Sequence, residues 1–159
     1  MAIIGIVAVD RNLAIGKEGK LPWHFSADMK FFRETTTGNS VVMGRRTWLT
    51  LKGPLKNRRN IVVSRDPEFR IDDSVTVARD VKSVLEIAQS QDEHLFVIGG
   101  AELYKAFIPH IDRWIVTEVP VTVEGADTFM PEDFLDGFEI SEMRQLDEGL
   151  RVRIYDRGV

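Results

Sequence analysis

Residues 94–108 read HLFVIGGAELYKAFI and hold an apolar run, a glycine pair and a helix-like segment in immediate succession. The apolar run at 94–98 is typical of a strand that is buried on both faces of a sheet. The glycine pair predicts a tight turn, and the helix predicted over 101–108 ends at Pro109. A strand that leads straight into a helix is the repeating unit of a parallel α/β sheet.

The same alternation continues in both directions along the chain. Further strands are predicted over residues 3–9, 40–44, 60–64, 75–78 and 114–121, and a hairpin over 138–143 and 152–155. Further helices are predicted over residues 27–36, 45–51 and 81–88, the first with Ser26 and the third with Asp80 as N-cap. Residues 10–24 are predicted to form a polar loop. The sequence therefore predicts an α/β fold, a single domain over residues 1–159. Its mostly parallel central sheet of about eight strands has an antiparallel C-terminal strand and about four helices on both faces.

The composition is typical of a soluble globular protein: 43% of the 159 residues are hydrophobic, 29% are charged, and the net charge is −4. The negative charge disfavours nonspecific binding to nucleic acid. With no cysteine and three histidines, a disulfide framework, thiolate-bound zinc and a multi-histidine metal site are not expected. No apolar run approaches the roughly 20 residues that span a bilayer, and the first residues lack the basic region of a secretory signal. We therefore expect a cytoplasmic protein without a membrane, nucleic-acid or metal partner.

Three of the predicted strands end in residues that suit anions: 44–47 (GRRT), 64–65 (SR) and 99–102 (GGAE). In an open parallel sheet, ligands bind at the carboxyl ends of the strands. Glycines let a ligand approach the backbone closely, and free N–H groups at a helix start favour an anion. Three such ends indicate a ligand with more than one phosphate, such as a dinucleotide, with Arg45 and Arg65 suited to a 2′-phosphate.

Asp28 stands in the first turn of a mostly apolar predicted helix. It can simply complement the helix dipole, or it can be a carboxylate in an apolar cleft that accepts two hydrogen bonds from an amidine-like edge. The preceding residues 16–23 include two glycines and can act as a lid over such a cleft or as an ordinary connection.

Together these residues resemble the dihydrofolate reductase family over essentially the whole chain. The matching pieces, in the family's order, are residues 6–10 (IVAVD), 15–16 (IG), 21–23 (LPW), Asp28, 31–32 (FF), 43–48 (MGRRTW), 54–55 (PL), Arg58, 60–65 (NIVVSR), 98–101 (IGGA), Thr117, Gly125 and 127–128 (DT). Each piece is modest, but the ordered set is highly specific. The resemblance implies NADPH-dependent reduction of 7,8-dihydrofolate to tetrahydrofolate by hydride transfer to pterin C6, in support of one-carbon metabolism, by a monomeric enzyme.

On the substrate side, the resemblance implies that Asp28 holds the pterin 2-amino group and N3, that Thr117 supports this carboxylate, and that Trp23 lies beside an ordered water. The expected catalytic residues are Asp28, Trp23 and Leu21, with water giving the proton to N5. The expected substrate-binding residues are Ile6, Asp28, Phe32, Arg33, Leu55, Arg58 and Thr117. Among them, Arg58 is expected to bind the glutamate α-carboxylate. Antifolates of the diaminopyrimidine or pteridine type are expected at the same site.

On the cofactor side, the resemblance implies that three arginines bind the NADPH 2′-phosphate. It implies that the pyrophosphate is bound by Arg46, Thr47 and the helix start at 99–102. It also implies that the two glycines are joined by a cis peptide. The expected cofactor-binding residues are Ala8, Ile15, Gly16, Arg45, Arg46, Thr47, Ser64, Arg65, Arg79, Gly99, Gly100, Ala101 and Glu102, of which Arg45, Arg65 and Arg79 are those of the 2′-phosphate.

Three positions depart from the family pattern. Glu102 stands where some relatives have an arginine, which removes a positive charge from the expected pyrophosphate site. Leu21 replaces a methionine found in some members, a change of similar volume. One extra residue precedes Asp127, which leaves open how this loop meets the lid.

Two other functions stay open on the residues alone. A reductase of the same fold that acts on a ribosylated pyrimidine intermediate of flavin synthesis would share the cofactor side. It would not need Asp28, Phe32 and Arg58 in this register. A folate- or nucleotide-binding protein without activity would bind NADPH but would not oxidise it in the presence of dihydrofolate.

Overall fold

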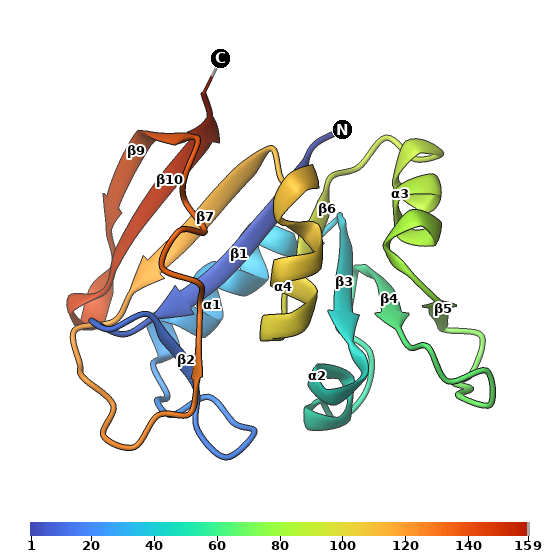
Figure 1. Ribbon diagram of the computed structural model, residues 1–159, viewed down its shortest axis with the longest axis horizontal. Helices are drawn as coiled ribbons and strands as arrows, with labels where there is room; N and C mark the ends of the chain where they lie inside the picture. Colours follow the sequence, from blue (N-terminus) through green and yellow to red (C-terminus); the bar gives the residue numbers. More distant parts are fainter. Residues whose placement is uncertain (159) are drawn as a thin grey trace.

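The computed structural model describes residues 1–158, and its centre is an eight-stranded sheet (Figure 1). The strands are β1 (Ile3–Val9), β3 (Ser40–Gly44), β4 (Arg59–Val63), β5 (Val75–Ala78), β6 (Leu95–Val97), β7 (Arg113–Glu118), β9 (Phe138–Gln145) and β10 (Arg151–Arg157). They lie in the order β5-β4-β3-β6-β1-β7-β10-β9. Neighbouring strands are parallel except where β10 pairs with β7 and with β9. The prediction of a mostly parallel sheet with an antiparallel C-terminal strand is confirmed.

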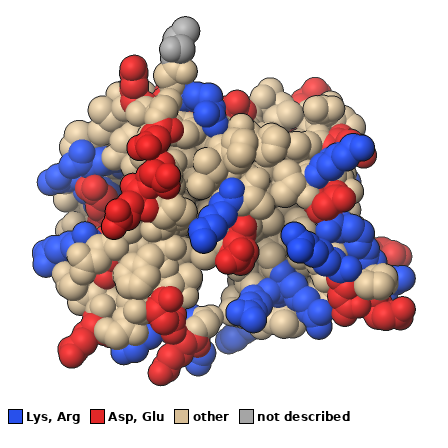
Figure 2. All heavy atoms as spheres, viewed as in Figure 1, with Lys and Arg blue, Asp and Glu red and all other residues tan. Residues whose placement is uncertain are grey.

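The strand order places β1 near the centre and brings three strand ends together. β1 pairs with β6 on one side and with β7 on the other, and β6 also pairs with β3. The chain returns across the sheet between β5 and β6, so the strand order reverses beside β1. Such a reversal leaves a ligand-binding crevice at the carboxyl ends of the strands. The arrowheads of β1 and β3 point toward the lower edge of the molecule in Figure 1, where the space-filling view in Figure 2 shows an open notch.

Four helices cover the two faces of the sheet: α1 (Ser26–Thr36), α2 (Arg45–Thr50), α3 (Val81–Gln89) and α4 (Ala101–Phe107). The apolar side chains of α3 and α4 lie in one core cluster, whereas those of α1 and α2 belong to or pack against the other. The first cluster is tight around β1, because a Cβ on Gly5 would lie 2.3 Å from the Trp114 ring. The predicted four helices on both faces are confirmed. Within residues 1–158, no helix is long and apolar enough to cross a membrane.

The two predicted N-caps have different outcomes. Asp80 caps α3 as expected, because its carboxylate accepts a hydrogen bond from the Ser83 N–H at 2.8 Å. Ser26, in contrast, is the first residue of α1 and not its N-cap. The N-cap is Phe25, whose side chain has no hydrogen-bond acceptor. The prediction for Ser26 was therefore wrong by one position.

The segment predicted as a polar loop contains a short strand. β2 (Ala14–Gly16) pairs with β8 (Thr128–Phe129) in a separate two-stranded antiparallel sheet. Three residues are too few to show a strand period, and the partner lies far along the chain, so the sequence pattern misses this pair.

β7 ends at Glu118, earlier than predicted. α4 ends at Phe107, one residue earlier than predicted, and Pro109 lies in the 3₁₀ turn (Ile108–His110) that follows it.

Candidate active site

The starts of α2 and α4 lie side by side at the carboxyl ends of β3 and β6. Gly44 N–H donates a hydrogen bond to Gly99 O at 2.8 Å, and Thr47 Oγ1 lies 3.8 Å from the place that a Cβ on Gly100 would take. The peptide bond between Gly99 and Gly100 is cis, and Gly99 has a φ of +119°. No side chain caps either helix. Backbone N–H groups at two adjacent helix starts are therefore available to an anion such as a pyrophosphate.

The arginines expected at the 2′-phosphate gather around residues 64–67, which follow β4. Arg79 Nη1 donates a hydrogen bond to the backbone oxygen of Asp66 at 2.6 Å. Arg45 reaches the same loop from α2, with its Nη1 3.3 Å from the Asp66 carboxylate. Arg65 belongs to the loop itself and is exposed. The structure thus brings Arg45, Arg65 and Arg79 together, and Figure 2 shows Lys and Arg side chains gathered at the lower right, on the side of α2 and the β4–β5 connection.

Two residues of this loop were not foreseen from the sequence. The Asp66 carboxylate partly neutralises Arg45, and the Arg45 guanidinium also lies 4.7 Å above the Phe69 ring. Ser64 Oγ accepts a hydrogen bond from the Asp66 N–H at 3.3 Å, which helps to fix the loop. No spacing in the sequence marks these contacts, because they depend on how an irregular loop turns back toward α2.

Asp28 is half-buried in the first turn of α1, and burial raises the pKa of its carboxyl group. On the opposite face of the sheet, Tyr104 donates its hydroxyl hydrogen bond to Ile6 O at 2.7 Å. Burial, and to a lesser degree the negative charge of Asp28, raises the pKa of the Tyr104 hydroxyl. A Cβ on Gly99 would lie 3.4 Å from the same ring, so Tyr104 lies between the glycine pair and β1. Tyr104 was not among the predicted site residues.

The surroundings of Asp28 are only partly those expected from the family. Thr117 is buried on β7 directly opposite Ala8 of β1. Among residues 1–158, no hydrogen bond joins the Thr117 hydroxyl to Asp28, so the support of this carboxylate by Thr117 stays a prediction. Trp23 Nε1 is buried and has no hydrogen-bond partner in the described part of the chain. A buried N–H without a partner is a position at which a bound water or ligand atom is favoured.

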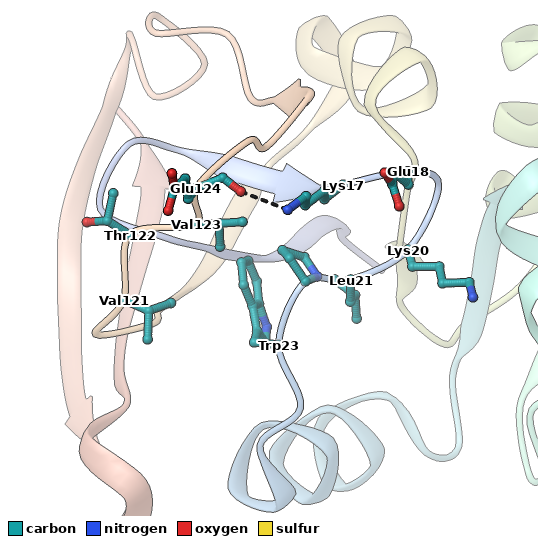
Figure 3. A pocket seen from close by; sticks show the side chains of 10 residues that line it. Lys17, Glu18, Lys20, Leu21, Trp23, Val121, Thr122, Val123 and Glu124 are labelled. Carbon is teal, nitrogen blue, oxygen red and sulfur yellow. Dashed lines mark hydrogen bonds between the residues drawn. The ribbon is translucent and has the colours of Figure 1, made fainter.

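Residues 16–23, the candidate lid, are attached to the loop between β7 and β8. Asp127 accepts a hydrogen bond from the Glu18 N–H at 2.8 Å and donates its own N–H to Gly16 O at 3.2 Å. Figure 3 shows Lys17 reaching the Glu124 carbonyl, at 2.9 Å. The extra residue before Asp127 therefore does not prevent contact with the lid.

Lid and loop together line a pocket of about 570 Å³, formed by residues 17, 18, 20–23 and 121–124 (Figure 3). Leu21 lines this pocket and is 62% exposed, so its side chain is free to contact a ligand.

Asp10 anchors this region and was not among the predicted site residues. It follows β1, is 4% exposed, and accepts hydrogen bonds from the N–H groups of Asn12, Ala14 and Val123 at 2.7 to 2.9 Å. Burial opposes the charge of Asp10, but the three backbone N–H groups outweigh it and lower the pKa. An acid directly after a buried strand was the available sequence signal.

Arg58 and Arg33 form a second positively charged position, at the C-terminal half of α1. Arg58 Nη1 donates to Thr36 Oγ1 at 3.1 Å and its Nε to Lys56 O at 2.9 Å. Burial, followed by the charge of Arg33, lowers the pKa of Arg58. Nearby, Phe32 and Leu55 pack against the core cluster that contains Ile6. Two close guanidinium groups beside an apolar wall suit a carboxylate on an aromatic ligand.

The remaining predicted residues lie around the same crevice. Ala8 is half-buried at the end of β1, and Ile15 and Gly16 belong to β2, which leads into residues 17–23. Arg46 is exposed in the first turn of α2. Ala101 and Glu102 begin α4, where Glu102 is the acidic residue of the first turn. Among residues 1–158, no group of three or more His, Cys, Asp or Glu side chains is placed to hold a metal ion.

Comparisons with known proteins agree with this arrangement. The sequence model of the dihydrofolate reductase family matches residues 2–154. The dihydrofolate reductase of Bacillus subtilis (strain 168) is 42% identical over 127 residues, which are 80% of this chain and 74% of that protein. That of Haemophilus influenzae is 37% identical over 145 residues, which are 90% of this chain and 88% of that protein.

A solved structure of dihydrofolate reductase from Enterococcus faecalis, complexed with NADP(H) and RAB-propyl, is similar over almost the entire fold. Its TM-score is 0.90 at 34% identity, and the match covers 99% of this chain and 97% of that one. The chain therefore belongs to the dihydrofolate reductase family.

Proposed function

We propose that this protein reduces 7,8-dihydrofolate to 5,6,7,8-tetrahydrofolate with NADPH. The observation that carries the proposal is the pairing of two unlike sides of one crevice in a member of this family. One side has a half-buried acid with a raised pKa, Asp28, and the other has two uncapped helix starts with an arginine cluster. The first suits the polar edge of a pterin, and the second suits a dinucleotide phosphate chain.

NADPH fits the cofactor side because this side offers both backbone donors and fixed positive charge. Arg45, Arg65 and Arg79 would hold the 2′-phosphate, and Arg46 and Thr47 would hold the pyrophosphate together with the glycine pair. The absence of a Cβ on Gly100 keeps the backbone accessible beside Thr47. When bound, the cofactor supplies the hydride that the pterin ring receives at C6.

On the substrate side, Asp28 accepts two hydrogen bonds from the pterin 2-amino group and N3. These two hydrogen bonds orient the ring, and the charge of the carboxylate polarises it so that it accepts the hydride more readily. Because the carboxyl group is engaged at that edge, the proton for N5 comes from water. The unpartnered Trp23 Nε1 is suited to hold an ordered water near the ring, and Thr117 supports the site from β7.

The rest of the substrate lies along α1. Ile6, Phe32 and Leu55 give apolar walls, and Arg58 with Arg33 binds the glutamate carboxylate. Closure of the lid with Leu21 excludes bulk solvent during hydride transfer. Diaminopyrimidine and pteridine antifolates carry the same amidine-like edge and bind Asp28 in the same way.

The direct test is the loss of NADPH absorbance with purified protein and dihydrofolate. We expect rapid oxidation of NADPH with dihydrofolate and none with a ribosylated aminopyrimidine of flavin synthesis. Oxidation with the pyrimidine alone would assign the protein to the flavin-type reductases. Binding of NADPH without oxidation under either condition would leave only a binding function.

A further inference from the structure

Glu148 joins two parts of the molecule that are far apart in sequence. It lies in the tight turn between β9 and β10, a 3₁₀ turn at Asp147–Gly149. Its Oε1 accepts a hydrogen bond from the Ala27 N–H at 2.9 Å. Ala27 is the residue directly before Asp28, so the contact holds the helix turn that carries the acid of the candidate site.

The start of α1 has no cap of its own. The N-cap residue Phe25 makes no side-chain cap bond, and the first hydrogen bond within the helix runs from Met29 N to Phe25 O at 3.2 Å. The N–H groups that precede Met29 therefore need partners from elsewhere. A carboxylate is a suitable partner, because the N-terminus of a helix carries partial positive charge. Glu148 thus acts as a cap supplied by a distant turn.

The backbone at Glu148 indicates that this side chain has a role beyond forming the turn. Its φ is +63°, a left-handed conformation that glycine or asparagine adopts more readily than glutamate. The turn is fixed on both sides, since Leu146 N–H donates to Leu150 O at 2.9 Å and Leu150 is fully buried. A residue held in an unfavourable conformation by its surroundings is a candidate for a functional role.

We propose that Glu148 is a positioning residue for Asp28: its carboxylate caps α1 and fixes the first turn, so that Asp28 meets the pterin edge in one orientation. The inference rests on the proposed function, because it assumes that Asp28 binds the pterin. Two parallel hydrogen bonds to a flat ring require a well-fixed carboxylate, so fraying of this turn weakens binding of the pterin. Among residues 1–158, Glu148 makes no hydrogen bond to α2 or α4, the helices that we propose bind the phosphates.

The test compares three variants of the turn. Glu148→Gly removes the cap and also relieves the left-handed backbone, so the turn itself is not weakened. Glu148→Gln keeps an oxygen that can accept the Ala27 bond. Asp147→Ala changes a neighbouring acid whose side chain makes no hydrogen bond to α1 among the described residues.

For Glu148→Gly we expect the Kd and KM for dihydrofolate to rise about threefold to tenfold. This is the change in affinity that corresponds to the free energy of losing a helix cap. The Kd for NADPH should stay unchanged. The Ala27 amide proton should exchange with solvent faster in Glu148→Gly than in the wild type. Glu148→Gln and Asp147→Ala should resemble the wild type in all these measurements.

If Glu148→Gly bound dihydrofolate as tightly as the wild type does, the inference would be overturned. It would also be overturned if Glu148→Gly lost as much affinity for NADPH as for dihydrofolate, because this would indicate a general structural effect. A loss in Glu148→Gln as large as in Glu148→Gly would also overturn it, since the hydrogen bond would then not be the cause. Failure of the proposed function has a different signature, because the wild-type protein would then not oxidise NADPH with dihydrofolate.

Discussion

The two sides of the crevice are built on different physical principles. The cofactor side consists of backbone N–H groups at the starts of α2 and α4 and of arginines, of which Arg45, Arg46 and Arg65 are exposed and Arg79 is half-buried. The substrate side depends on one half-buried acid, whose pKa burial raises, and on contacts between distant segments. Where several exposed groups share the binding of one ligand, the loss of one of them weakens binding only a little. Where binding depends on one buried group, its loss has a large effect. Substitutions should therefore have graded effects on the first side and large effects on the second.

The largest effect is expected for Asp28→Asn, which keeps the size of the side chain and removes its charge. Hydride transfer at neutral pH should fall about a hundredfold or more, because the variant lacks the charge that we propose polarises the pterin. The rate should recover at acid pH, where dihydrofolate arrives already protonated. Single-turnover kinetics over a range of pH measure this, with the exposed Glu34→Gln on the same helix as control.

The same variant should also be more stable at neutral pH. A raised pKa in the folded state means that the fold disfavours the ionised carboxylate, so stability falls as pH rises through that pKa. Asp28→Asn removes this charge and should show a higher midpoint of urea unfolding at neutral pH but not at acid pH. A less stable variant would show that the carboxylate is stabilised by a partner in the fold.

The next largest effect is expected for Arg58→Leu, with a rise in the KM for dihydrofolate of about tenfold to a hundredfold, since it removes a charge-assisted hydrogen bond. A pteridine substrate without the glutamate tail should be unaffected. Arg59→Leu is a matched control, because the neighbouring Arg59 instead donates to Gln91 at 3.3 Å. An unchanged KM for dihydrofolate in Arg58→Leu would remove this residue from the glutamate site.

Asp10→Asn should destabilise the fold by about 1–3 kcal/mol, because an amide cannot accept all three backbone hydrogen bonds. The three bonds lower the pKa of Asp10, so its contribution is present above the ordinary pKa of an aspartate and is lost as pH falls through the lower value. Urea unfolding at several pH values measures this, with the exposed Asp133→Asn as control. Equal stability of Asp10→Asn and the wild type near neutral pH would contradict the assignment.

A smaller effect is expected on the cofactor side from Arg65→Ala. The preference for NADPH over NADH should narrow about fivefold to twentyfold, since Arg45 and Arg79 remain at the 2′-phosphate. Affinities for both cofactors measure this, and Arg144→Ala on the far edge strand should leave the preference unchanged. A preference that does not change in Arg65→Ala would exclude this residue from the phosphate contact.

The smallest effect is expected for Glu102→Gln, which removes the negative charge from the first turn of α4. The affinity for NADPH should improve about twofold to fivefold at low salt, as expected for one charge at a helix end. The gain should shrink at high ionic strength, where exposed charges are screened. Titrations at two salt concentrations test this, and an equal gain at both would argue against an electrostatic cause.

The sequence predicted the cofactor side better than the substrate side, because the former is local. A buried strand, a glycine pair and a helix start are adjacent along the chain, so residues 44–47 and 99–102 could be recognised together. The predicted bounds of β1, β3 and β5 also agree with the structure, since each is a compact apolar run.

Contacts made by loops, turns and very short strands could not be predicted in the same way. The pairing of β2 with β8, the ion pair of Arg45 with Asp66 and the cap from Glu148 to Ala27 each depend on a loop, a turn or a very short strand on at least one side. Irregular segments carry no periodic signal that identifies their partners. Tyr104 shows the same limit, because an apolar spacing explains its burial but not that its hydroxyl reaches Ile6 O.

Binding of a 2,4-diaminopyrimidine tests most directly whether Asp28 holds an amidine-like edge as a carboxylate. The ultraviolet spectrum of the bound ligand reports its protonation state. We predict that the wild-type protein binds the pyrimidine in its protonated form at a pH at which the free ligand is neutral. Asp28→Asn should bind it neutral and at least about tenfold more weakly. A neutral ligand on the wild-type protein, with the same affinity in Asp28→Asn, would contradict the account.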